Sequence, residues 1–387
     1  MRLSNLAFRQ AALAVLVSAG IANTSVFAQS SVILYGSIDN GVDYTSNRGG
    51  KASYQALSSV KWGSRVGFTG REDLDGGMAA IFTLENGFDG FSGALGQGGL
   101  MFGRQAFVGL SSRYGTFTAG RQYDSVANYL GALATSDQWA GYPGAHPGDY
   151  DNVNDAFREN NAFKYASPNL NGFTFNGLIA PGGVAGSTTK NRIFSTGGGY
   201  TAGGFTLNAA YLNVKNPATA AYGGTVTPVT GTTYLNPVTS PVYRGYASAR
   251  TYSVFGTATK YTFKGTTLGA MYTYTSFADI VTTSSTPNAG SVKFHNLEVS
   301  VMQYITPSLM VDASYDFTKA ERAHYHQVNA MLDYFLSKRT DAYLLAVAQD
   351  ASGIDSTGTT AVASINGLTA SRSSHQLFLR AGINHKF

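Results

Sequence analysis

Apolar and polar side chains alternate along the chain from Val32 onward, in blocks of about ten residues, the length of a tilted strand that crosses a bilayer. The final block shows the pattern: one parity carries Leu377, Leu379, Ala381 and Ile383, and the other carries Gln376, Arg380 and Asn384. A period of two residues is that of a pleated strand, with successive side chains on opposite faces. About sixteen such blocks follow one another, which predicts an all-β chain.

The connections between these blocks alternate between short and long. Short turns are expected at 72–76, 112–114, 167–171, 202–203, 264–265, 306–308 and 337–339. Longer loops are expected at 45–58, 89–99, 122–157, 181–190, 215–247, 278–291 and 351–372, and the connection at 320–323 is a short exception. Turns at one rim and loops at the other are typical of an outer-membrane barrel with both ends in the periplasm. The pattern therefore predicts a 16-stranded antiparallel transmembrane β-barrel with short periplasmic turns and long outer loops.

Charged residues within the blocks decide which face of the sheet meets lipid. An arginine or lysine facing lipid at the membrane midplane costs roughly 2–4 kcal/mol, and an acid somewhat less. The strand charges must therefore point inward; they are Asp39, Arg65, Glu85, Arg158, Asp312, Asp333 and Arg380. A lumen lined by so many charges needs water, and sixteen strands enclose a barrel wide enough for an aqueous channel.

Composition agrees with a barrel and argues against other classes of protein. Only 13% of the 387 residues are charged, about half of what a soluble domain carries, while glycine is abundant with 46 residues. The formal charge is +5, and Arg2 and Arg9 account for two of these charges, which leaves +3 for the rest. This charge is too small to indicate nucleic-acid binding. The chain has no cysteine, so no disulfide is expected.

The first residues have the character of a secretory signal. Residues 1–28 combine a basic start, an apolar run from Ala11 to Ala22 and small residues before a cleavage point after Ala28. The apolar run is shorter than the roughly 17–25 residues that a membrane-spanning helix needs. We therefore expect a signal peptide at 1–28 and a barrel domain at 29–387.

Several motifs, taken together in this order, resemble one family. They are VILYGSIDNGV at 32–42, GSRVGFTGREDLD at 63–75, FGRQAFVGL at 102–110, YGTFTAGRQYD at 114–124, NNAFKYASP at 160–168 and GINHKF at 382–387. The chain resembles the general trimeric porins of Gram-negative outer membranes, in the form typical of β-proteobacteria. The resemblance implies a homotrimer that lets small hydrophilic solutes and inorganic ions diffuse across the outer membrane. It also implies that the third long loop, at 122–157, folds into the lumen as a constriction loop; by length alone, 215–247 is nearly as good a candidate.

The same resemblance points to particular site residues. Arg65, Arg104 and Arg158 match the family's wall arginines, which face the inserted loop, although each could instead pair with a structural carboxylate. Candidate loop acids are Asp124, Asp137, Asp149, Asp151 and Asp155, of which Asp137 lies about where the family has an eyelet acid, and Glu85 is a further wall acid. Because wall arginines would outnumber nearby wall acids, we expect a weak anion preference. Phe387 matches the terminal aromatic residue that such proteins present to the outer-membrane assembly machinery.

Other kinds of chemistry find little support in the sequence. His324 and His326 could share a strand face as metal ligands, but their parity is that of Val328 on the lipid side, so no metal site and no cofactor are expected. No serine or histidine stands in a recognisable nucleophile and base arrangement, so the chain is not expected to be an enzyme. The alternative function is that of a surface adhesin or receptor acting through the long outer loops.

Overall fold

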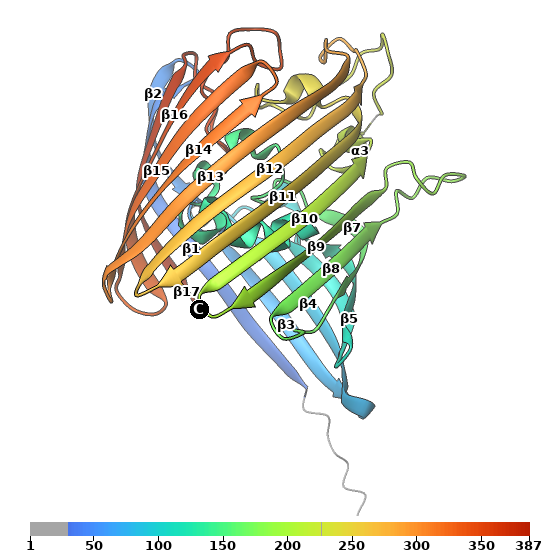
Figure 1. Ribbon diagram of the computed structural model, residues 1–387, viewed down its shortest axis with the longest axis vertical. Coiled ribbons are helices and arrows are strands. Elements are labelled where there is room, and N and C mark those ends of the chain that lie inside the picture. The colour runs from blue at the N-terminus through green and yellow to red at the C-terminus, as the bar shows by residue number, and fades with distance from the viewer. Residues whose placement is uncertain (1–29, 226) are drawn as a thin grey trace, which may run out of the picture.

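The structure is a computed structural model that describes residues 30–387 with the exception of Val226; the expected signal peptide at 1–28 lies outside the described residues. Its strands are β1 (Ser31–Arg48), β2 (Lys51–Ser58), β3 (Arg65–Leu74), β4 (Met78–Gly87), β5 (Gln105–Ser112), β6 (Gly115–Gln122), β7 (Glu159–Ala166), β8 (Phe173–Ala180), β9 (Ile193–Ala202), β10 (Phe205–Lys215), β11 (Ala249–Phe263), β12 (Thr266–Ile280), β13 (Gly290–Thr306), β14 (Leu309–Ala320), β15 (Ala323–Phe335), β16 (Thr340–Gly353) and β17 (His375–Lys386). Each strand pairs antiparallel with its neighbours, and together they form the tilted cylinder of Figure 1.

The cylinder is closed, and it contains sixteen wall segments rather than seventeen. β1 closes the barrel by pairing with β17, with Asp39 opposite Asn384. Along its other edge β1 pairs first with β3 and then with β2, whose ends are separated by an irregular stretch at 59–64. β2 and β3 therefore share one place in the wall, and the expected 16-stranded antiparallel barrel is confirmed.

One expected outer loop is wrong. The range 45–58 was expected to be a loop, but β1 continues to Arg48, and β2 starts at Lys51 after a turn at Gly49 and Gly50. Both glycines have positive φ (64° and 106°), which allows the tight reversal. The ladder extends through this range, with Tyr44 opposite Tyr54, so the hairpin replaces a loop. The alternation of the sequence stops instead at 59–64, where Ser59 has a φ of 66°.

The two faces of the barrel differ as the alternation predicts. Along β15, Val328, Leu332 and Tyr334 are exposed on the outside, while Asn329 and Asp333 between them are buried inside. Exposed aromatic residues lie near the short turns, along one rim of the barrel. They include Tyr114, Phe173, Phe205, Tyr261 and Tyr304. An apolar outer band with aromatic residues at its border is typical of membrane-embedded barrels.

The longest insertion without a strand runs inside the cylinder, and we call residues 122–157 the inner loop. It carries α2 (Ser125–Tyr129), the 3₁₀ turns η3 (Gly131–Leu133), η5 (Tyr142–Gly144) and η6 (Pro147–Asp149), and the π-helical turn η4 (Ser136–Ala140). Figure 1 shows these short helices in green inside the ring of strands. The remaining helical segments are η1 (Asp75–Gly77), η2 (Gln97–Gly99), α3 (Pro217–Ala220) and η7 (Arg244–Tyr246). No helix among the described residues is long and apolar enough to cross a bilayer.

Apolar packing holds the inner loop against the inside of the wall. Val126, Leu130 and Tyr150 of the loop belong to one buried cluster with Leu212 of β10 and Phe294 of β13. Trp139 and Ala140 belong to a second cluster with Val347 of β16 and Phe378 of β17. Much of the buried apolar core therefore lies between the inner loop and the wall, and residues of two other connections, such as Tyr246 and Ile365, join the same clusters.

Candidate functional site: the constriction

Hydrogen bonds tie the inner loop to wall strands around the barrel. Near its start, Ser125 N–H donates to Ser195 Oγ of β9 (3.0 Å), and farther on Thr135 N–H donates to Glu298 Oε1 of β13 (2.9 Å). Gln327 Nε2 of β15 donates to the carbonyl oxygens of Pro143 and Ala145, and Tyr142 N–H donates to Val60 O next to β2 (3.1 Å). The loop thus crosses the lumen and narrows the space that remains.

A cavity of about 630 Å³ lies between the inner loop and the wall near β2–β5, and we call it the constriction cavity. Its lining includes all three predicted wall arginines, Arg65, Arg104 and Arg158, together with Lys61. The loop side contributes Asp137, Asp149 and Asp155, and Asp89 joins from the connection after β4. Basic groups on the wall therefore face acidic groups on the loop.

Glu85 holds two of the arginines in place. Arg104 Nε donates to Glu85 Oε1 at 2.7 Å, and Arg65 Nε lies 3.7 Å from Glu85 Oε2. Tyr35 Oη donates to the same carboxylate at 2.9 Å. The glutamate side chain is only 5% exposed, whereas Arg65 keeps 27% and Arg104 13% of its side-chain surface open. Glu85 therefore positions the guanidinium groups from behind and is not part of the cavity lining.

Arg158 is held by the inner loop. Its Nη1 donates to the carbonyl oxygen of Asp155 at 3.0 Å, and its guanidinium lies 5.1 Å from the ring centre of Tyr123. These two contacts hold the guanidinium in one orientation. The three arginines thus line one cavity from β3, from the approach to β5 and from the end of the loop.

Not all the predicted loop acids reach the cavity. Asp124 is the N-cap of α2, where its Oδ1 accepts hydrogen bonds from the N–H groups of Val126 and Ala127. Asp151 is buried against His146 and Thr273 on the far side of the loop. Asp137, Asp149 and Asp155 do line the cavity, and Asn154 Nδ2 holds Asp137 with a hydrogen bond of 2.6 Å.

Burial alters the acids of the loop. It raises the pKa of Asp137 well above the ordinary value, and the nearby Asp155 carboxylate raises the pKa further. Burial likewise raises the pKa of Asp155, although the neighbouring Arg158 and Arg104 oppose this. Asp149 also has a pKa raised by burial and by Asp151. The negative charge on the loop side is therefore weaker than the count of carboxyl groups implies.

Sequence reasoning missed Lys61 as a member of the site. Its ammonium group lies 2.5 Å from Asp333 Oδ2 and 2.8 Å from Asp341 Oδ2, and this cluster joins the stretch after β2 to β15 and β16. In the alternating pattern Lys61 falls on the face opposite Trp62, which indicates a side chain that points into the lumen. The chain is not a regular strand there, so the alternation alone did not locate it. Arg380, expected to face the lumen, does point inward, where it pairs with Asp43 at 2.8 Å and is fully covered.

Two further predicted features have simple positions. Phe387 exchanges two backbone hydrogen bonds of 3.1 Å with Gly36, so it extends the seam between β17 and β1. His324 and His326 stack on Phe317 along the outside of the barrel, and His326 Nδ1 lies 2.6 Å from Tyr315 Oη. The histidines therefore have an aromatic environment on the lipid side.

Comparison with known proteins adds to this geometry. Residues 11–353 match the family model described as Gram-negative porin. The chain belongs to this family. This chain is 34% identical to an outer membrane porin protein of Bordetella pertussis over 178 residues. It is also 34% identical to outer membrane porin protein 32 of Delftia acidovorans over 174 residues. Each alignment covers 42% of this chain. Both alignments span only 46% of the relative, so the porin covers about half the length of the curated relatives it matches.

A third relative and two solved structures agree with the assignment. The major outer membrane protein P.IB of Neisseria gonorrhoeae is 30% identical over 205 residues, which is 51% of this porin and 56% of the relative. In fold, the porin is similar to the anion-selective porin from Comamonas acidovorans, with a TM-score of 0.71, 21% identity, and coverage of 93% and 100% of the two chains. It is also similar to OmpT of Vibrio cholerae, with a TM-score of 0.63, 15% identity, and coverage of 92% and 99%. The porin is thus an outer-membrane β-barrel protein.

Proposed function

We propose that this porin forms a water-filled channel through which small hydrophilic solutes and inorganic ions diffuse passively across the outer membrane. The observation that carries the proposal is the constriction cavity: a closed barrel narrowed by an inner loop, with three arginines and several acids in the lining of one cavity. Such a transverse arrangement of charge in a narrow channel orients polar solutes, and it acts more strongly there than in bulk water. The proposed role is permeation and not catalysis.

The charge balance of the cavity favours a weak preference for anions. Arg65, Arg104 and Arg158 line the cavity together with Asp89, Asp137, Asp149 and Asp155, while Lys61 is paired with Asp333 and Asp341. The three acids of the loop have raised pKa values, so they hold protons more readily than free aspartate, whereas arginine stays charged. The Comamonas acidovorans protein of similar fold is an anion-selective porin, which supports the same direction here.

The test is the reversal potential of the purified porin in a planar bilayer under a salt gradient. We expect a modest anion preference that falls or reverses when Arg65, Arg104 and Arg158 are all replaced by glutamine. The matched control replaces Arg71, Arg113 and Arg339, which lie at or next to the periplasmic turns, and it should leave selectivity nearly unchanged. Cation preference in the unaltered protein would contradict the proposal, and absence of conductance steps would favour an adhesin or receptor.

The proposed assembly is a homotrimer in outer-membrane lipid. The support is the family membership together with the apolar outer band, which needs either lipid or another subunit to cover it. We also propose that residues 1–28 direct export and that Phe387 is read by the outer-membrane assembly machinery. Native gels of unheated protein should show a trimer, and deletion of Phe387 should lower its yield in the outer membrane.

A further inference from the structure

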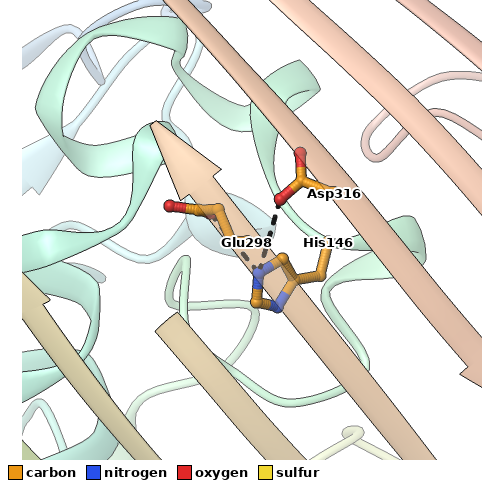
Figure 2. Close-up of side chains that lie close together, drawn as sticks. All are labelled: His146, Glu298 and Asp316. Carbon is orange, nitrogen blue, oxygen red and sulfur yellow. Dashed lines mark ion pairs between the residues drawn. The ribbon is translucent and has the colours of Figure 1, made fainter. Parts of the chain in front are cut away.

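His146 is a buried imidazole on the side of the inner loop that faces away from the constriction cavity. Its side chain is 1% exposed and lies against the inner wall at β13 and β14. Figure 2 shows its ring beside two carboxylates from these neighbouring strands, Glu298 and Asp316. A histidine and two carboxylates from three separate segments thus converge on one point.

The other ring nitrogen of His146 fixes the orientation of the imidazole. His146 Nδ1 lies 2.7 Å from Asp151 Oδ2, and this oxygen also accepts a hydrogen bond of 2.6 Å from Thr273 Oγ1. A carboxylate acceptor places a proton on Nδ1, so Nε2, the ring nitrogen that faces Glu298 and Asp316, is the one that a metal ion would take. The same carboxylate and histidine arrangement supports the histidine ligands of many metal sites.

The atoms that face one another are not hydrogen-bonded. His146 Nε2 is 3.4 Å from Glu298 Oε2 and 3.9 Å from Asp316 Oδ1, longer than a charge-assisted hydrogen bond of about 2.8 Å. Neither Nε2 nor Asp316 Oδ1 has a hydrogen-bond partner within the described part of the chain. The second oxygen of each carboxylate is occupied, Glu298 Oε1 by Thr135 N–H and Asp316 Oδ2 by Asn329 Nδ2, both at 2.9 Å.

The cluster also holds three carboxyl groups and a single basic group. Asp151, Glu298 and Asp316 are each at most 3% exposed, and the only ion-pair partner that the described residues give them is His146. Buried carboxylates without compensating charge are costly, so a dication between them removes much of the penalty.

We propose that His146, Glu298 and Asp316 form a binding site for one divalent cation of the zinc class, which fastens the inner loop to β13 and β14. Zinc takes nitrogen and carboxylate ligands at about 2.0–2.2 Å, which places tetrahedral ligand atoms roughly 3.3–3.5 Å apart. The three candidate ligand atoms lie within 4.8 Å of one another, so a small contraction brings them into range. Asp151 is the positioning residue, and water completes the coordination.

The test strips metal from the porin in detergent with a chelator, adds Zn²⁺, removes the excess by dialysis and measures the zinc that stays bound. We expect elemental analysis to find about one tightly bound zinc per chain, and Co²⁺ in its place to give the absorption of a tetrahedral site. Glu298→Gln and His146→Ala should lose this ion and this absorption. Asp151→Asn, which leaves the ligands in place, should weaken zinc affinity roughly 10- to 100-fold.

His375→Ala is the matched control, because His375 is 78% exposed and also pairs with a carboxylate, Asp350, at 2.5 Å. This variant should bind zinc as the unaltered protein does. Equal zinc binding by the unaltered protein and both ligand variants, or loss of the ion on substitution of His375, would overturn the proposal. The mobility of unheated protein on gels verifies that each variant is folded, and Glu298→Gln, which keeps the side-chain volume, serves if His146→Ala does not fold.

Discussion

The negative charge of Glu85 offsets part of the positive charge of the constriction, because Glu85 contacts both Arg104 and Arg65. We expect Glu85→Gln to raise the anion-to-cation permeability ratio roughly two- to threefold, since a unit charge about 8 Å from the ion path in water contributes about 0.5 kcal/mol. Reversal potentials measure the ratio. Asp73→Asn removes the same charge from an exposed periplasmic turn, where Asp73 pairs with Arg71, and should have little effect.

We expect the acids of the inner loop to make ion selectivity depend on pH. Because burial raises the pKa of Asp137 and of Asp155, these groups gain protons at a higher pH than free aspartate. Their negative charge is therefore lost as the pH falls toward and through the raised pKa values, and anion preference should increase along the same range. Reversal potentials at a series of pH values measure the effect. Asp137→Asn should reduce the slope, and a slope of opposite sign would contradict this assignment.

The individual site residues were only partly predictable from the sequence. Arg65, Arg104 and Arg158, which family motifs locate in the sequence, line one cavity, whereas Lys61 was missed. Asp124 and Asp137 look alike in the sequence, yet one caps a helix and the other lines the cavity. Only the path of the loop separates these roles, and no local pattern encodes that path.

At the scale of elements, the contact between the inner loop and the stretch after β2 is sterically tight. Gly141 has a φ of 66°, and an added Cβ would lie 1.9 Å from the carbonyl oxygen of Val60. We expect Gly141→Ala to push the loop from the wall and to change single-channel conductance. Gly183→Ala is the matched control, since Gly183 has a φ of 63° with nothing within 4 Å of the added carbon. It should cost only backbone strain, of order 1 kcal/mol, and leave conductance unchanged.

Strands were more predictable than loops for a physical reason. Lipid on one side and water on the other impose a strict period of two, so β14 through β17 follow directly from alternation. The hairpin between β1 and β2 was mistaken for a loop because its residues near Gly49 lie beyond that constraint, where both faces can be polar. The alternation of apolar and polar residues likewise does not predict the irregular stretch at 59–64 between β2 and β3.

At the scale of the whole molecule, the cost of an arginine on the outer surface should depend on how deep in the bilayer it lies. Leu344, in the middle of β16, and Leu336, beside a periplasmic turn, have similar exposed fractions of 57% and 58%. Leu344→Arg should reduce the free energy of unfolding by roughly 2–4 kcal/mol, and Leu336→Arg by about 0–1 kcal/mol. Denaturant unfolding of the porin in lipid vesicles measures both. Equal losses would contradict the proposed orientation in the bilayer.

The pairing of β1 with β17 would allow the chain to be circularly permuted. Gly36 bonds to Phe387, and Ser31 lies about 17 Å farther along the strand, since five residues rise about 3.4 Å each. A short flexible linker could join these positions, while new ends open at 181–190, where Gly183 and Gly186 have free space around them. Such a circular permutant would keep every wall pairing, so the order in which the strands are made is separable from the cylinder they form.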